Sequence, residues 1–293
     1  MNLDQLFATI VSAAPLAGLY VVIGLGWVVL FRATKILNFA TGQFLMVGAY
    51  LFWVAEANLH LPFVVALVAT LVAVGLLGAF VHIALMRPLA GQKGFGPVIL
   101  TFGIATIIDS LVHVIFGGNT DSVSIPLPNV SVSITHTAAF TSGDLLVMGL
   151  AVVLLSATGL IVRYSRWGIQ MRAAAEDSLL ASQSGINIDR VFMLGWAFTL
   201  VVLTVIGIAW ASLTVLTPDL ENIGLNGLAP VIVGGMDSIA GVLPGAIVVA
   251  LAENISALYF GESVRTAAVM VVVLVAIAIR PRGLFGSRSV TRV

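Results

Sequence analysis

Ionisable side chains inside the apolar stretches of this chain are the first candidates for chemistry. Asp109 and His113 stand four residues apart in the apolar run 95–116, a spacing that places both on one face of a helix. Glu253 stands in the middle of another apolar run, 239–260. A carboxyl group in such surroundings either finds a hydrogen-bond donor or stays protonated. Two interpretations follow: structural pairing, or a proton relay.

Motifs of enzymes and nucleotide-binding proteins do not occur in the chain. It has no G-x-x-x-x-G-K-[ST] sequence, so it does not bind ATP through a P-loop. It has no H-E-x-x-H and no cysteine, and its four histidines are scattered, which argues against a metal site. We therefore expect no catalytic residues and no metal ligands. A membrane-embedded enzyme is the alternative from another class, and it would need a clustered acid, base or metal set.

The composition identifies the environment in which these residues work. Hydrophobic residues make up 60% of the 293 positions, charged residues 9%, and the mean hydropathy is +1.13. Soluble domains carry roughly 25% charged residues, so the chain is an integral membrane protein. Its formal net charge of +0 gives no support to nucleic-acid binding.

The apolar runs predict an all-α, polytopic transmembrane helical bundle of eight or nine segments, forming a single transmembrane domain over 1–293. A bilayer core of about 30 Å needs roughly 20 apolar residues per helix. The long runs are 6–31, 61–86, 95–116, 145–162, 191–216, 239–260 and 264–280. Two further runs, 39–55 and 223–236, are short and contain glycine and polar residues, so we expect broken or re-entrant helices there. Whether they span or re-enter is open at this point.

The first short run begins with polar residues that could contact a ligand. Asn38, Thr41, Gly42 and Gln43 stand at its start. A helix N-terminus inside a membrane offers free N–H groups and a partial positive charge, which suits a carboxylate or carbonyl oxygen. In the alternative interpretation, Asn38 and Gln43 cap helices and join neighbouring helices.

The second short run ends in a glycine pair followed by polar residues. Gly234 and Gly235 interrupt the helix, and either Asp237 or Ser238 can cap the next one. Irregular backbone at membrane depth is tolerated only where protein or water solvates it. We therefore expect both short runs to line a substrate pathway.

The distribution of basic residues predicts the orientation of the chain. With the N-terminus outside, one basic residue, Arg265, falls outside and twelve fall in the cytoplasm, as the positive-inside rule requires. The twelve are Arg32, Lys35, Arg87, Lys93, Arg163, Arg166, Arg172, Arg190, Arg280, Arg282, Arg288 and Arg292. The loop 163–190 and the C-terminus are then cytoplasmic, and the loop 117–143 is outside. Its alternating Ser, Val and Ile predict a short hairpin, either a cap over helix ends or a docking surface for an outside partner.

The loop 163–190 is a polar island between two apolar runs. Its part from Met171 to Ser182 is rich in alanine and leucine, which favour a helix, with Glu176 and Asp177 in the middle. Gly185 follows as a C-terminal stop. We expect one short amphipathic helix across the cytoplasmic face.

Four stretches of the chain resemble one family. The stretches resemble parts of the LivH-type permeases and occur in the same order along the chain. They are ILNFATGQFLMVGAY (36–50), AAAEDSLLASQSGINIDR (173–190), VGGMDSIAGVLPGA (233–246) and IRPRGLFG (279–286). These are the membrane subunits of branched-chain amino acid ABC importers, and the resemblance covers essentially the whole chain.

The resemblance implies an inner-membrane permease that moves substrate by alternating access. It would pair with a second homologous permease subunit, two cytoplasmic ATPase subunits and an extracytoplasmic substrate-binding protein. ATP and Mg would bind to the ATPase subunits, and this chain would carry no cofactor. The helix around Ala173–Gly185, with Glu176, Asp177 and Ser182, would be the coupling element.

One departure from the family pattern bears on the solute. After Asn-Phe-Ala the family usually reads His-Gly-Glu or close to it, where this chain has Thr41-Gly42-Gln43. We therefore expect a loss of charge at this segment. Branched-chain amino acids are the expected solute, with urea, short amides or aromatic acids as alternatives. An uncoupled channel or an ion-coupled secondary transporter is a further alternative, for which Asp109 and Glu253 are the candidate coupling residues.

Overall fold

The computed structural model describes residues 3–89, 95–118, 120–128, 130–135 and 138–286. Lys93, Arg288 and Arg292, used above to predict the orientation, lie outside the described residues. The chain divides into two compact units. Unit 1 comprises Met1–Val28, Leu127–Leu155 and Asn226–Val293, and unit 2 comprises Val29–Pro126 and Ser156–Leu225. The prediction of a single transmembrane domain concerns both units together and stays a prediction.

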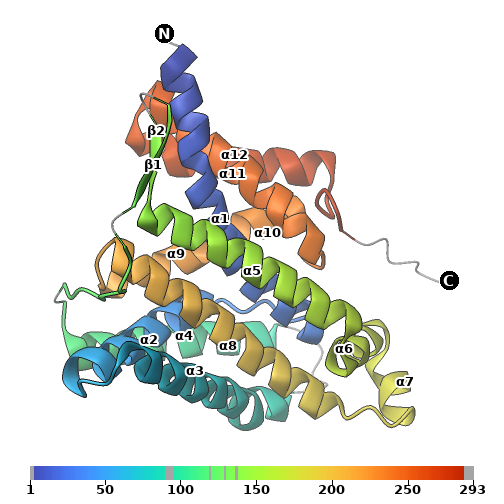
Figure 1. Cartoon of the computed structure of the whole chain (residues 1–293). Helices are drawn as coiled ribbons and strands as arrows, with labels where there is room; N and C mark the ends of the chain where they lie inside the picture. Colours follow the sequence, from blue (N-terminus) through green and yellow to red (C-terminus); the bar gives the residue numbers. More distant parts are fainter. Residues whose placement is uncertain (1–2, 90–94, 119, 129, 136–137, 287–293) are drawn as a thin grey trace. The chain divides into compact units, whose positions relative to one another are not determined.

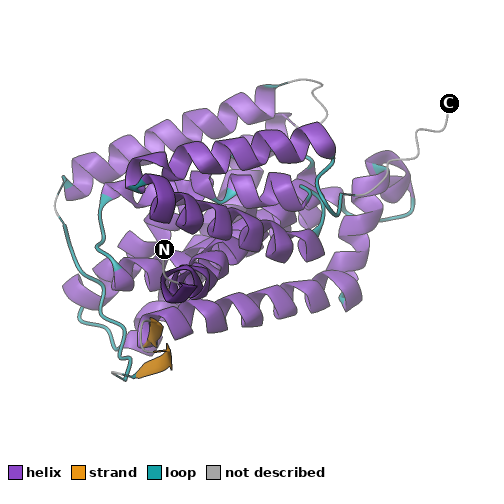
Figure 2. Ribbon diagram, turned by 90° about the horizontal axis from the view of Figure 1, so that it is seen from above, coloured by secondary structure: helices purple, strands orange, loops and turns teal. Residues whose placement is uncertain are grey.

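Helices make up most of the described chain (Figure 2). Seven of those described are long and apolar enough to cross a bilayer. They are Asp4–Thr34, Phe63–Leu89, Gly96–Phe116, Ser142–Tyr164, Ile188–Leu213, Ile239–Phe260 and Glu262–Ile279. Each overlaps one of the seven long apolar runs. The predicted polytopic helical fold is therefore confirmed.

The two short runs form short helices, as predicted. The first is α2 (Thr41–Trp53), which continues as a π-helical turn, η1 (Val54–Asn58). The second is split into α9 (Glu221–Asn226) and α10 (Leu228–Gly234). A helix of six or seven residues is far shorter than the roughly 20 residues a crossing needs. The number of crossings stays a prediction.

The core of unit 2 is formed by α2, α3 and α8. The helix α3 (Phe63–Phe80) continues as η2 (Val81–Met86) and η3 (Arg87–Leu89), and α4 (Gly96–Phe116) follows. The helix α8 (Ile188–Leu213) packs against both α2 and α3 (Figure 1). The Phe44 and Trp196 rings, both almost fully buried, meet edge to face at 6.1 Å between centroids. At Gly48 an added Cβ would overlap Thr204 of α8, so the two helices approach each other closely there.

Unit 1 contains the C-terminal helices and a β-hairpin. Its helices include α10, α11 (Ile239–Phe260) and α12 (Arg265–Ile279), with the turn η5 (Glu262–Val264) between the last two. The strands β1 (Ser131–Thr135) and β2 (Ala138–Thr141) pair antiparallel, with Ser131 opposite Thr141. The predicted hairpin in 117–143 is therefore confirmed. The helices α1 (Leu3–Thr34) and α5 (Ser142–Tyr164) contribute residues to both units.

Candidate functional site

The turn before α2 is held by Asn38. The Asn38 side-chain oxygen accepts a hydrogen bond from the Ala40 N–H at 3.1 Å, and the Thr41 hydroxyl donates to the Asn38 carbonyl at 2.7 Å. Ala40 occupies the N-cap position, and no side chain caps α2. The interpretation of Asn38 as a helix cap is therefore wrong, because this side chain stabilises the preceding turn instead.

Gln43 contacts a carboxylate that the sequence analysis did not assign to this site. Its side-chain amide donates to Glu221 Oε2 at 2.6 Å, and only 7% of Gln43 is exposed. Partial burial raises the pKa of Glu221, which lies outside the seven candidate spans, and the Gln43 amide acts in the opposite direction. We expected this segment to lose charge because Thr41 and Gln43 stand where the family has ionisable residues. The Glu221 carboxylate, 178 positions from Gln43 along the chain, supplies an ionisable group at the same place in unit 2.

The contact between Gln43 and Glu221 depends on two glycines. A Cβ at Gly42 would overlap the Glu221 carbonyl, and a Cβ at Gly224 would overlap the Gly42 backbone. The start of α2 and the helix α9 therefore touch backbone to backbone, which no other residue type permits. We call this group the α2–α9 cluster: Asn38, Thr41, Gly42, Gln43, Glu221 and Gly224.

The second predicted group lies in unit 1, where the C-terminal segment contacts it. The Leu284 and Phe285 N–H groups donate to the carbonyls of Val233 and Gly234, each at 2.9 Å. Gly235 adopts a φ of 113° and lies so close to Gly286 that a Cβ would stand 2.7 Å from its nitrogen. Two of the stretches that carry the family resemblance, 233–246 and 279–286, are therefore packed together.

The polar residues after this glycine pair have separate roles. Ser238 is the N-cap of α11, and its hydroxyl accepts from the Gly241 N–H at 3.0 Å. The predicted cap is thus confirmed for Ser238, while Asp237 precedes it as part of the turn. The place of Gly234, Gly235, Asp237 and Ser238 on a substrate pathway stays a prediction.

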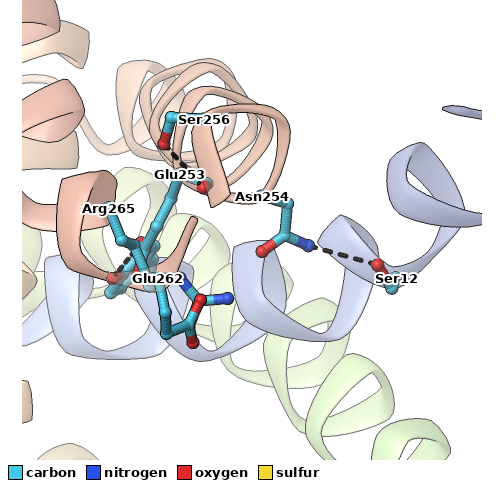
Figure 3. A network of polar contacts seen from close by, with 7 residues as sticks. Ser12, Glu253, Asn254, Ser256, Glu262 and Arg265 are labelled. Carbon is cyan, nitrogen blue, oxygen red and sulfur yellow. Dashed lines mark hydrogen bonds and ion pairs between the residues drawn. The ribbon is translucent and has the colours of Figure 1, made fainter. Parts of the chain in front are cut away.

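Glu253 is part of a polar network in unit 1 (Figure 3). It is 8% exposed and accepts a hydrogen bond from the Tyr20 hydroxyl at 2.6 Å. The Arg265 guanidinium lies 3.6 Å from the same carboxylate and 3.1 Å from that of Glu262. Neighbouring Asn254 donates to the Ser12 hydroxyl at 3.3 Å. These contacts match the structural pairing interpretation of Glu253.

Asp109 and His113 contact each other on α4, as their spacing predicts. His113 Nδ1 lies 3.1 Å from the Asp109 carboxylate and 3.0 Å from the Asp109 carbonyl. The two side chains are 36% and 52% exposed. Within the described ranges, no three His, Asp or Glu side chains come together in a way that could hold a metal ion.

The cytoplasmic loop of the prediction folds as two helices. They are α6 (Arg166–Glu176) and α7 (Ser178–Gln183). Asp177 separates them, and its carboxylate caps α7 by accepting from the Leu179 and Leu180 N–H groups at 2.9 and 3.0 Å. The expectation of one continuous helix with Asp177 in its middle is therefore wrong, because a capping aspartate with extended backbone starts a new helix there. We call Ser165–Gly185 the α6–α7 elbow.

The elbow is attached to the rest of unit 2 on one side. The Trp167 indole donates to the Val191 carbonyl at 3.2 Å, and Arg172 donates to the last carbonyls of α5 at Val162 and Arg163. Gly185 adopts a φ of 85° and ends α7, as predicted. Of the predicted coupling residues, Glu176, Asp177, Ser182 and Gly185 are exposed, and Ala173 is half-buried.

Two exposed leucines on α7 are not among the predicted coupling residues. Leu179 and Leu180 are 68% and 59% exposed, and Ile169 of α6 is 53% exposed. Neighbouring exposed leucines on a polar element are typical of a protein–protein contact. Their apolar character was visible in the sequence, but their exposure depends on the way in which Asp177 turns the chain.

The fold and these sites define a polytopic helical membrane protein built around short, interrupted helices. The chain belongs to the family described as "Branched-chain amino acid transport system / permease component", whose sequence profile matches residues 9–279. It is similar to the high-affinity branched-chain amino acid transport system permease protein LivH of Salmonella typhimurium, at 25% identity over 99% of this chain and 97% of the relative. It is also similar to the corresponding protein BraD of Pseudomonas aeruginosa, at 22% identity over 97% of each chain. PsaBC from Streptococcus pneumoniae in complex with Fab, a solved structure, is 15% identical with a TM-score of 0.48, covering 93% of this chain and 92% of that chain.

Proposed function

We infer that this chain is the permease subunit of an ATP-driven importer, with branched-chain amino acids as the expected solute. The observation that carries the inference is the family match over residues 9–279. The relatives named above are described as permease proteins for branched-chain amino acids and match along nearly their whole length.

The proposed transporter contains further subunits besides this chain. We propose that two cytoplasmic ATPase subunits supply the energy and bind ATP and Mg, since this chain has no P-loop of its own. A second homologous permease completes the membrane part, and an extracytoplasmic binding protein delivers the solute. In this division the chain itself catalyses no reaction.

The orientation places the elbow where the ATPases can reach it. With the N-terminus outside and the C-terminus in the cytoplasm of the inner membrane, Arg163, Arg166, Arg172 and Arg190 lie on the cytoplasmic side. The α6–α7 elbow then lies on that side as well. It contacts the ATPase and passes its movement to α8 through the Trp167 contact, which drives alternating access.

The α2–α9 cluster is the part of unit 2 that we place on the solute pathway. It combines an amide, a hydroxyl and a carboxylate at the start of a short helix. Such polar groups suit the ammonium and carboxylate of an amino acid. Because Thr41 and Gln43 differ from the usual family residues at these positions, urea, short amides and aromatic acids are alternative solutes. An ion-coupled transporter would need Glu253 or Asp109 for coupling, and both already have structural partners.

Changes at Gln43 and Glu221 test this placement. We expect Gln43→Leu and Glu221→Gln each to lower solute uptake by about ten-fold or more, because a hydrogen bond to a charged group contributes about 1.5–3 kcal/mol. Asn222→Ala, at the exposed neighbouring position, serves as the matched control and should transport normally. Uptake is measured in vesicles that hold the whole transporter. Normal uptake by both cluster variants would show that these residues serve helix packing and do not line the solute pathway.

The solute itself is identified through the binding protein of the same system. We expect this protein to retain leucine, isoleucine or valine after purification, as detected by mass spectrometry and by calorimetric titration. Retention of urea, a short amide or an aromatic acid in their place would transfer the proposal to the alternative solute while leaving the importer role intact.

A further inference from the structure

We propose that Asp189 changes its hydrogen-bond partner during transport, from Arg87 to the buried imidazole of His82, and so links the movement of α8 to α3. In the described structure, Arg87 Nε lies 3.0 Å from Asp189 Oδ2, and His82 Nε2 lies 3.8 Å from Asp189 Oδ1. All three residues belong to unit 2. In the importer proposed above, on which this exchange rests, His82 is a positioning residue that acts through helix movement.

His82 is a buried polar side chain without a hydrogen bond. It lies in the π-helical extension η2 of α3 and is 3% exposed. Neither of its ring nitrogens has a hydrogen-bond partner among the described residues. The 3.8 Å from Nε2 to Asp189 is too long, since an N–H···O hydrogen bond spans about 2.7–3.2 Å. Folded proteins leave few buried polar groups unpaired, because an unpaired group costs stability. The imidazole therefore gains a partner in a second arrangement of the two helices.

The Asp189 carboxylate can serve either partner, because its two oxygens face different neighbours. The Arg87 and Asp189 side chains are 59% and 46% exposed, and ion pairs exposed to water contribute little to stability. A movement of about 1 Å brings the imidazole N–H into hydrogen-bond reach of the carboxylate. A hydrogen bond to a charged group is stronger than such an exposed ion pair. The exchange therefore needs a small movement and releases a weak contact.

The first turn of α8, which carries Asp189, is tied to the α6–α7 elbow. Asn187 is the N-cap of α8 and follows Gly185, the last residue of the elbow, by two positions. The Trp167 indole of the elbow donates a hydrogen bond to the Val191 carbonyl in this same turn. A displacement of the elbow therefore moves the Asp189 carboxylate as well.

The helices α3 and α8 are held together one turn away from His82. A Cβ at Gly78 would stand 2.8 Å from the Ala197 Cα, so the two backbones touch there. His82 follows Gly78 by four positions, and its ring meets the Phe192 ring of α8 at 6.1 Å. The backbone of Val81–Met86 is π-helical, a rare form that is frequent at functional sites. The contact at Gly78 is thus a pivot, and the helix ends beyond it can close on each other.

Solute uptake per ATP hydrolysed tests the exchange. Uptake of radiolabelled leucine and ATP hydrolysis are both measured in vesicles that hold the whole transporter, with the loaded binding protein present. His82→Phe keeps a buried ring without a hydrogen-bond donor, and His82→Gln keeps an N–H donor without the ring. Ile83→Phe, at the neighbouring and 50% exposed position, is the control. Thermal unfolding in detergent reports the stability of each variant.

We expect His82→Phe to take up about ten-fold less solute per ATP hydrolysed, because a hydrogen bond to a charged group is lost. Its unfolding temperature should be unchanged or higher, since an apolar ring replaces an unpaired polar one. His82→Gln should keep most of the coupling, and Ile83→Phe should behave like the unaltered transporter.

The opposite order would overturn the exchange. If His82 served helix packing alone, His82→Phe would couple normally and His82→Gln would lose uptake. Equal losses in these two variants would also overturn it, because the N–H donor would then make no difference. The importer role is judged separately, by the unaltered transporter. Uptake by that transporter without any need for ATP would overturn the importer role, and the exchange with it.

Discussion

Replacing both Leu179 and Leu180 by serine is expected to detach the ATPase subunits from the membrane part of the transporter. Both leucines are more than half exposed, so serine costs the isolated chain little stability. Burying two leucines in an interface contributes about 3 kcal/mol or more, which corresponds to roughly a hundred-fold in affinity. The measurement is co-purification of the ATPase with the permease, together with ATP hydrolysis in the presence of the loaded binding protein.

The control for this experiment lies on the same helix. Gln183 is exposed at the end of α7, and Gln183→Ser leaves the two leucines and the Asp177 cap in place. We expect this variant to co-purify normally. Equal ATPase recovery with the double-leucine variant and with Gln183→Ser would show that the elbow is a solvated linker.

Replacing Arg265 by alanine is expected to destabilise unit 1 more than other single surface changes. It removes the ion pair to the buried Glu253 carboxylate and leaves the hydrogen bond from the Tyr20 hydroxyl in place. Breaking a buried ion pair costs about 3–5 kcal/mol, and because Arg265 is 36% exposed we expect about 2 kcal/mol here. The measurement is thermal unfolding of the purified transporter in detergent.

A second change separates charge pairing from proton relay. The double variant Glu253→Gln with Arg265→Ala removes the unpaired charge, so it should be more stable than Arg265→Ala alone. Uptake by Glu253→Gln should remain close to that of the unaltered protein. If Glu253→Gln abolished uptake without lowering the unfolding temperature, the carboxylate would be a relay and the structural role would be rejected.

Local features of the fold could be predicted from the sequence. The long apolar runs define the seven candidate spans because the thickness of a bilayer fixes the length of a membrane helix. A cap at Asp237 or Ser238 and a stop at Gly185 were predictable, because both effects act within a few residues. The hairpin β1–β2 follows from period-2 alternation for the same reason.

Contacts between distant residues could not be predicted. Gln43 and Glu221 are 178 positions apart, and Tyr20 and Glu253 are 233 apart. Neither sequence neighbourhood indicates its partner, since the pairing depends on how helices pack. The prediction at Asp177 was wrong for a local reason. The composition around Asp177 fits the interior of a helix, yet the Asp177 carboxylate stabilises the start of a new helix better than the interior of a continuous helix.

We propose that ATP hydrolysis in partner subunits drives solute through this chain. Its most direct test is uptake of radiolabelled leucine, isoleucine and valine into vesicles that contain the permease pair, with the binding protein outside and ATP inside. We predict uptake that requires both the ATPase subunits and hydrolysable ATP, and that stops when either is left out. Uptake that continues at the same rate after the ATPase subunits are removed would contradict the claim and identify a channel or an ion-coupled transporter.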